Sequence, residues 1–194
     1  MVAAVRLITE KGLAQTRVAD VARALEVPRS LFYWYFRDLE DLVCQAIVDA
    51  RRALRHHLAS ALAEVDSPLA KLYVIAREST RLAMTDEIER VFTTEVEAAV
   101  REPYAAEMRK SVEVFIAEVV EIIVRGQSEG LVRTDRPAKT LAYCVRALVH
   151  HNVALYHRGF LANGDDIADT VASVAVRGLC ERVDDALAIE ATEW

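Results

Sequence analysis

Apolar residues recur at helical spacing along almost the whole sequence, and this periodicity is the feature that most restricts the fold. In the first segment, Val2, Val5 and Ile8 lie three residues apart, which places them on one face of a helix. No segment alternates apolar and polar residues with the period of two that a half-buried strand requires. The chain has only six glycines and four prolines in 194 residues, and most of them stand where a helical pattern begins or ends. We therefore expect an all-α fold.

Glycine, proline and capping residues divide this pattern into successive helices. Gly12 stands where the first helix would end, Thr16 is the expected N-cap of the second, and Pro28 opens the third. Asp38 would cap a fourth helix that runs to about residue 63. Later helices are expected over residues 68–84, 86–101, 103–130, 137–158 and 165–183. Short helices at the start therefore set the N-terminal segment apart from the long helices that follow.

The net charge of −6 argues at first against binding to nucleic acid, but the charge is unevenly distributed. Residues 1–37 carry six basic and three acidic side chains, a net of +3, so the remainder carries −9. Because DNA attracts only the surface that faces it, the charge of the N-terminal segment matters more than the total. An acidic remainder would also discourage the wrong face from docking.

The cysteines and the hydropathy pattern indicate a cellular compartment. Cys44, Cys144 and Cys180 form no CxxC pair, so we expect reduced thiols and no zinc site. The longest uncharged run, residues 147–157, has 11 residues, whereas a membrane-spanning helix needs about 20. The first residues include Arg6 where a signal peptide would be apolar. We therefore expect a cytoplasmic protein that does not enter a membrane.

Residues 16–36 contain two short helical segments joined by a tight turn at residues 26–28. This arrangement is typical of a helix-turn-helix, whose second helix lies in the major groove of DNA. Phe32 and Phe36 are four residues apart, so they would share one face and pack inward. The residues expected to face outward are Arg29, Ser30, Tyr33 and Trp34.

An ordinary helical hairpin with a buried aromatic cluster is the alternative for this segment. It explains the two phenylalanines but leaves Tyr33, Trp34 and Tyr35 without cover, because so short a helix cannot bury every side unless it lies centrally. Exposed aromatic side chains are costly unless a partner covers them, and DNA would do so. Tyrosine hydroxyls and arginines also suit phosphate, and such contacts position a helix without reading sequence.

Residues that recur at family-specific spacing extend through the first 45 positions. They are Gly12, Leu13, Thr16, Val18, Asp20, Val21, Ala22, Val27, Leu31, Phe32, Tyr33, Phe36, Glu40 and Leu42. In this order they resemble the DNA-binding domain of TetR-family regulators, and the stretch over residues 27–36 resembles it most. Residues 130–137 are similar to the turn before the family's penultimate helix. The resemblance implies a three-helix helix-turn-helix domain over residues 1–45 and a helical ligand-binding and dimerisation domain over residues 46–194.

The resemblance also implies contacts to DNA, residue by residue. Tyr33 would bind a phosphate, and Arg29 would bind a phosphate or touch a base. Thr16 would contact a backbone phosphate as it caps its helix, and Arg17 would reach a phosphate or a base edge. The expected DNA-contact residues are Thr16, Arg17, Arg29, Ser30, Leu31, Tyr33, Trp34 and Tyr35.

Several positions depart from the residues that are usual in the family. Glu26 stands where glycine is usual, which predicts a strained non-glycine residue in the turn. Tyr35 replaces a common histidine, and Leu39 replaces a common lysine that would supply a phosphate contact. Leu31 and Trp34 are apolar at positions that often meet bases, so recognition would rest on thymine methyl groups and DNA shape. Family members often carry a basic arm before the first helix, and here such an arm is either absent or outside the sequence.

The resemblance further implies a homodimer. The last two long helices, residues 137–158 and 165–183, would pair with the same helices of a second copy in a four-helix bundle. Two recognition helices about 34 Å apart would then read a palindromic operator. The expected interface residues are Ile167, Ala168, Val171, Ala172, Val174, Ala175 and Gly178. Packing within one chain is the alternative.

The middle helices would enclose a pocket for a small apolar or aromatic effector, since large apolar side chains with a few polar tips suit such a molecule. The expected lining residues are Tyr73, Met84, Phe92, Phe115, Tyr143 and His151. Ordinary core packing is the alternative for each of them. The effector would act by favouring a conformation whose two helix-turn-helix units no longer match the spacing of the grooves.

An enzyme is the first competing class, and the sequence argues against it. None of the five histidines follows a glutamate by three residues, so the Glu-x-x-His pairs of a di-iron bundle are absent. The GxGxxG, P-loop and G-x-S-x-G motifs are absent too. His150 and His157 share a helix face, but two ligands do not make a strong metal site. We expect no enzymatic activity, no cofactor and no metal.

The resulting prediction is a homodimeric, sequence-specific repressor that binds double-stranded DNA and is released by a small molecule. A regulator whose effector is another protein, or one that activates transcription, is the second competing class. The sequence does not separate these alternatives.

Overall fold

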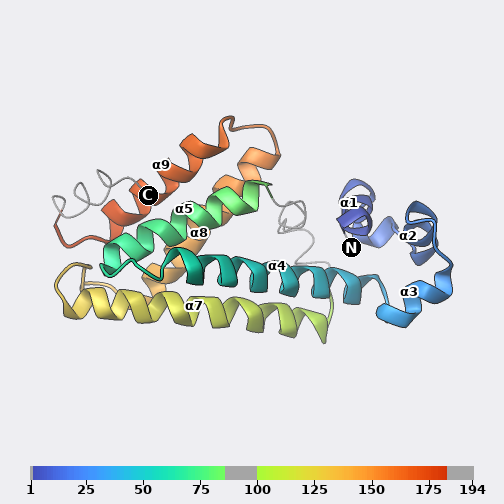
Figure 1. Cartoon of the computed structure of the whole chain (residues 1–194), viewed down its shortest axis with the longest axis horizontal. Helices are drawn as coiled ribbons and strands as arrows, with labels where there is room; N and C mark the ends of the chain where they lie inside the picture. The colour runs from blue at the N-terminus through green and yellow to red at the C-terminus, as the bar shows by residue number, and fades with distance from the viewer. Residues whose placement is uncertain (1, 86–99, 183–194) are drawn as a thin grey trace. The chain divides into compact units, whose positions relative to one another are not determined.

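The computed structural model describes residues 2–85 and 100–182, which form eight α-helices and one 3-10 helix (Figure 1). The elements are α1 (Val2–Lys11), η1 (Leu13–Gln15), α2 (Val18–Ala24), α3 (Arg29–Tyr35), α4 (Leu39–Ala61), α5 (Pro68–Thr85), α7 (Tyr104–Ser128), α8 (Ala138–His157) and α9 (Gly164–Leu179). In these residues the only β-type pairing is an isolated bridge between Val132 and Cys180. The all-α prediction is confirmed, and most of the helix expected over residues 86–101 lies outside the described residues.

The helix boundaries follow local signals in the sequence. Gly12 has a φ of 82°, which glycine adopts without strain, and its N–H donates to the carbonyl of Ile8 at 2.8 Å. The carboxylate of Asp38 accepts the backbone N–H of Asp41 at 2.8 Å and caps α4 as expected. None of the described helices is long and apolar enough to span a membrane.

The expected N-cap role of Thr16 is wrong. The N-cap of α2 is Arg17, whose backbone N–H donates to the carboxylate of Asp20 at 3.1 Å. The Thr16 hydroxyl donates instead to the carbonyl of Gly12 at 2.8 Å. The short 3-10 helix after Gly12 directs the Thr16 side chain toward the end of α1. No residue pattern in the sequence predicted this 3-10 helix.

The described residues divide into two compact units. The first unit contains residues 2–53 and 100–112, and the second contains residues 54–85 and 113–182. The division falls within α4 and within α7, so each of these helices contributes residues to both units. The domain boundary expected after residue 45 was placed where the family resemblance ends. Residue 45 lies inside α4, which continues without a break to Ala61.

The first unit has its own apolar core. Helices α1, α2, α3 and the first half of α4 contribute to it, and so does the first part of α7. The core residues are Ala4, Val5, Ile8, Val21, Phe32, Leu42, Val43, Cys44, Ala46, Ile47, Val100, Tyr104 and Met108. Burial of these side chains stabilises the helix-turn-helix segment by roughly 1.5–3 kcal/mol for each large residue.

The second unit is organised around α5. This helix packs mainly against α9 and also against α8, while the end of α4 lies alongside α7 (Figure 1). Small residues on α9 let α5 approach closely, because Ala168 and Ala172 are almost fully buried. The loop after α7 is tied to the end of α9 by hydrogen bonds from Arg133 N–H to Leu179 O and from Glu181 N–H to Leu131 O, each 2.9 Å.

Candidate nucleic-acid interface

The turn between α2 and α3 is held by backbone hydrogen bonds and one unusual residue. Glu26 has a φ of 54°, in the left-handed region that few non-glycine residues adopt. The N–H of Glu26 donates to the carbonyl of Arg23 at 3.2 Å, and that of Val27 donates to Ala22 at 3.0 Å. The predicted strained residue is confirmed at Glu26. The turn fixes the start of α3 relative to α2.

Helix α3 separates its buried face from its exposed face as predicted. Phe32 is buried in the core of the first unit, and its ring lies 5.5 Å from that of the half-buried Phe36. On the other face, Tyr33, Trp34 and Tyr35 are 58%, 79% and 61% exposed. The rings of Trp34 and Tyr35 meet edge to face at 5.3 Å. A helix of seven residues thus presents three aromatic rings to solvent.

Seven of the eight expected DNA-contact residues are exposed. These are Arg17, Arg29, Ser30, Leu31, Tyr33, Trp34 and Tyr35. Thr16 is the exception, because it is 6% exposed and its hydroxyl group donates a hydrogen bond to the Gly12 carbonyl. A direct phosphate contact by the Thr16 hydroxyl would therefore compete with an existing bond. The two exposed arginines add positive charge to the aromatic surface of α3.

A polar network after α3 was not foreseen from the sequence. The Arg37 guanidinium donates to the Asp41 carboxylate at 3.1 Å and lies 4.9 Å from the centre of the Tyr104 ring. The Tyr104 hydroxyl donates to Asp38 at 3.2 Å. Nearby, Glu40 accepts from the backbone N–H and the guanidinium of Arg101, both at 2.8 Å. The first turn of α4 is thereby joined to the start of α7.

The same network shifts the pKa of Asp41. Burial acts to raise this pKa, but hydrogen bonds from Arg37 and Gln45 outweigh it, so the pKa is lowered. The Asp41 carboxylate stays charged and continues to hold Arg37. The spacing of four between Arg37 and Asp41 is a local signal, whereas nothing in the sequence pairs Asp38 with a tyrosine 66 residues later.

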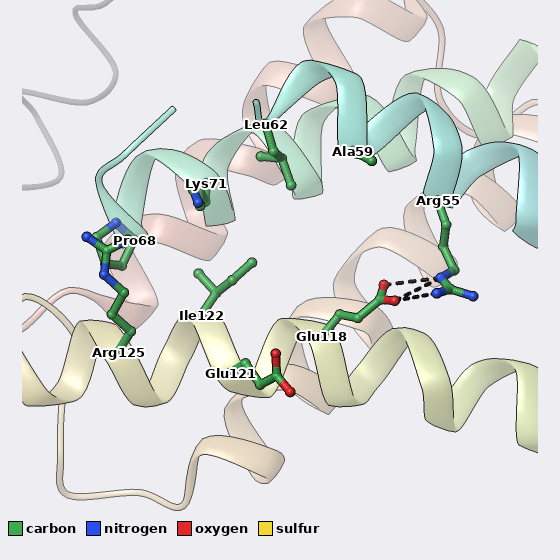
Figure 2. A pocket seen from close by; sticks show the side chains of 9 residues that line it. All are labelled: Arg55, Ala59, Leu62, Pro68, Lys71, Glu118, Glu121, Ile122 and Arg125. Atoms are coloured by element: carbon green, nitrogen blue, oxygen red, sulfur yellow. Dashed lines mark hydrogen bonds and ion pairs between the residues drawn. The ribbon is translucent and has the colours of Figure 1, made fainter. Parts of the chain in front are cut away.

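The second unit contains a pocket of about 450 Å³ between α4, α5 and α7 (Figure 2). Its lining combines apolar side chains with five charged ones. The residues are Arg55, Ala59, Leu62, Pro68, Lys71, Glu118, Glu121, Ile122 and Arg125. A volume of this size is within the range of small-molecule sites.

None of the five expected ligand residues that the structure describes lines this pocket. Tyr73 and Met84 are buried, and Phe115 is half-buried. Tyr143 and His151 are exposed on α8, while Phe92 lies outside the described residues. The role predicted for these residues in ligand binding stays a prediction.

The expected dimer residues on α9 fall into two groups. Ile167, Ala168, Val171, Ala172 and Ala175 are buried within the chain. Val174 is 52% exposed, and Gly178 is exposed as well. Packing within one chain, the alternative left open by the sequence, accounts for the buried group. Within the described ranges no cluster of three or more histidine, cysteine or acidic residues could hold a metal ion.

Comparison with known proteins identifies the N-terminal segment. Residues 1–46 match the profile of the family described as "Bacterial regulatory proteins, tetR family". The HTH-type transcriptional regulator TtgR of Pseudomonas putida is 39% identical over 59 residues, which cover 30% of this chain and 28% of TtgR. The match thus spans less than a third of that relative.

Solved structures match over most of the chain, at low sequence identity. FadR from Bacillus subtilis, in complex with stearoyl-CoA, has a TM-score of 0.80 and 16% identity, and covers 91% of this chain and 95% of its own. AibR, in complex with isovaleryl coenzyme A and operator DNA, has a TM-score of 0.73 and 16% identity, with coverage of 89% and 93%. At such identity these structures show a shared fold.

Proposed function

Since residues 1–46 belong to the TetR family of bacterial regulatory proteins and the chain has the fold of solved members, we propose that this protein is a homodimeric repressor released from its operator by a small molecule. The observation that carries the DNA-binding part is the outer face of α3. Three aromatic side chains are exposed there beside Arg29 and Ser30, on a helix fixed to its core by Phe32. A major groove would cover this face and neutralise its charge.

The homodimer would use the exposed sides of α8 and α9. On α8, Tyr143, Ala147 and His151 are exposed at a spacing of four, so they share one face. On α9, Val174 and Gly178 are exposed in the same way. A second copy packed on these faces would form a four-helix bundle. The exposure of Tyr143 and His151 thus favours a role between subunits over a role in a pocket.

The effector would bind in the second unit. FadR and AibR were crystallised with stearoyl-CoA and isovaleryl coenzyme A, two molecules that combine an apolar acyl group with a polar carrier. The pocket between α4, α5 and α7 offers apolar and charged side chains together. These observations support a small molecule with an apolar part.

Selection of binding sites from random double-stranded DNA at near-physiological salt tests the DNA-binding part directly. We expect enrichment of a palindrome whose half-sites are about one helical turn apart. A folded, dimeric protein that enriches no sequence would contradict the proposal and favour the hypothesis that a protein partner covers α3.

A further inference from the structure

The pocket in the second unit has an apolar floor between two helices. Leu62, the residue directly after α4, and Ile122 on α7 point toward each other across it, and Pro68 closes one end (Figure 2). Ala59 leaves room beside Leu62 because its side chain is small. A hydrocarbon chain laid along these residues would lose contact with water and gain about 25 cal/mol for each Å² of apolar surface buried.

The charges around this floor differ in whether they already have partners. Arg55 donates to Glu118 at 3.0 Å, and this pair spans α4 and α7 at one end of the pocket (Figure 2). At the other end, Arg125 donates to Glu129 at 2.6 Å and to Asp66 at 3.1 Å. Both arginines are therefore neutralised by carboxylates.

Lys71 differs from the two arginines. It lines the pocket from α5 and is half-buried, and in the part of the chain that the structure describes its ammonium group has no acceptor. An anion placed beside this ammonium group would supply the acceptor that the described residues do not. Glu121 also has no cationic partner among the described residues, but it is exposed and its side chain points away from α4 (Figure 2).

We infer that this pocket binds an amphipathic anion, with its head group at Lys71 and its apolar chain between Leu62 and Ile122. The assignment names the effector class of the proposed repressor, and its regulatory consequence rests on that proposed function.

Titration calorimetry with decanoate and decanol tests the assignment, because the two probes share a chain and differ in charge. We expect wild-type protein to bind decanoate about tenfold more tightly than decanol. Lys71→Met should weaken decanoate binding by about tenfold and leave decanol binding unchanged. Lys139→Met, at an exposed lysine of α8 outside the pocket, is the matched control and should behave as wild type.

Circular dichroism confirms that each variant is folded. Equal affinity for the two probes, absence of decanoate binding, or wild-type behaviour of Lys71→Met would overturn the inference. Calorimetry contains no DNA, so failure of operator selection would refute the proposed function and leave this result standing.

Discussion

Trp34 is the residue whose environment in the free chain is hardest to explain without a partner. Its side chain is 79% exposed, although tryptophan gains more than most residues from burial. Phe160, in the loop between α8 and α9, is 74% exposed but lies outside the helix-turn-helix segment that contains Trp34. The local context therefore assigns a role to Trp34, where exposure alone would not.

We expect Trp34→Ala to change the preference between operators by about 1–3 kcal/mol for each base pair that the indole contacts. The reason is that an apolar side chain in the major groove discriminates through thymine methyl groups and shape. Fluorescence anisotropy with a set of single-base operator variants measures this preference. Phe160→Ala is the control and should leave every affinity unchanged. A uniform loss across all sequences would assign Trp34 to backbone contact or packing.

Glu78 is a buried carboxylate whose charge is held by three neighbours. It accepts from Arg81 at 2.8 Å, from Arg77 at 3.0 Å and lies 3.0 Å from His57 Nε2. Burial acts to raise the pKa of Glu78, but the hydrogen bonds from Arg81 and His57 outweigh it, so the pKa falls below its ordinary value of 4.5. A lowered pKa in the folded state stabilises the fold above the unfolded value, and this contribution is lost as the pH falls through the folded value.

Glu78→Gln should therefore lower the free energy of unfolding by about 2 kcal/mol at pH 7, because it removes the charge that the surrounding cations require. Below pH about 4.5 the difference from wild type should shrink, because Glu78 is protonated first in the unfolded chain and then in the folded state as the pH falls through its lowered pKa. Urea unfolding at pH 7 and at a pH below about 4.5 measures this difference in the free energy of unfolding, with Glu113→Gln as an exposed control. The same difference at both pH values would show that packing, and not charge, is what Gln disturbs.

Among the elements, the end of α7 shows where close packing leaves no room for a side chain. A Cβ at Gly126 would lie 2.5 Å from Val132 Cγ2 and 3.2 Å from Pro68 Cβ, and Val132 is fully buried. Gly178 on α9 has no atom within 4 Å of the corresponding position in the single chain. The two helical glycines thus have opposite surroundings.

Gly126→Ala should destabilise the fold by about 1–3 kcal/mol through overpacking, which exceeds the gain in helix propensity. Within the single chain Gly178→Ala meets no atom and should gain up to about 1 kcal/mol from helix propensity, so a loss of stability would indicate close contact with the second copy. Thermal unfolding of both variants measures the contrast. If the double variant Gly126→Ala with Val132→Ala recovers stability, the contact between the new methyl group and Val132 is the cause of the loss. A Gly126→Ala variant more stable than wild type would contradict the prediction.

Signals close together in the chain predicted the elements well. Pro68 and Asp38 mark helix starts by chemistry that acts within one turn, and the positive φ of Glu26 followed from a single departure from glycine. The pocket and the Tyr104 contact could not be predicted in this way. They depend on which faces of distant helices meet, and for a large residue such as Tyr73 the sequence alone does not distinguish a pocket lining from a core.

At the scale of the whole molecule, the remaining question is how two copies present their α3 helices together. Ala147 lies at the centre of the exposed face of α8, with Tyr143 and His151 one turn away on either side. Ala117 is also an exposed alanine, on α7. The same substitution at the two sites therefore separates an effect on assembly from an effect of added charge.

We expect Ala147→Arg to be monomeric in sedimentation experiments, because a long charged side chain cannot be buried in a close helix–helix contact without a partner. Its affinity for a palindromic operator should fall by about a hundredfold, toward that for an isolated half-site, since the second half-site no longer adds to binding. Ala117→Arg should remain dimeric with wild-type affinity. If Ala147→Arg remains dimeric, this face of α8 is not part of the subunit interface. If it is monomeric and keeps full affinity for the operator, one copy alone is sufficient for recognition.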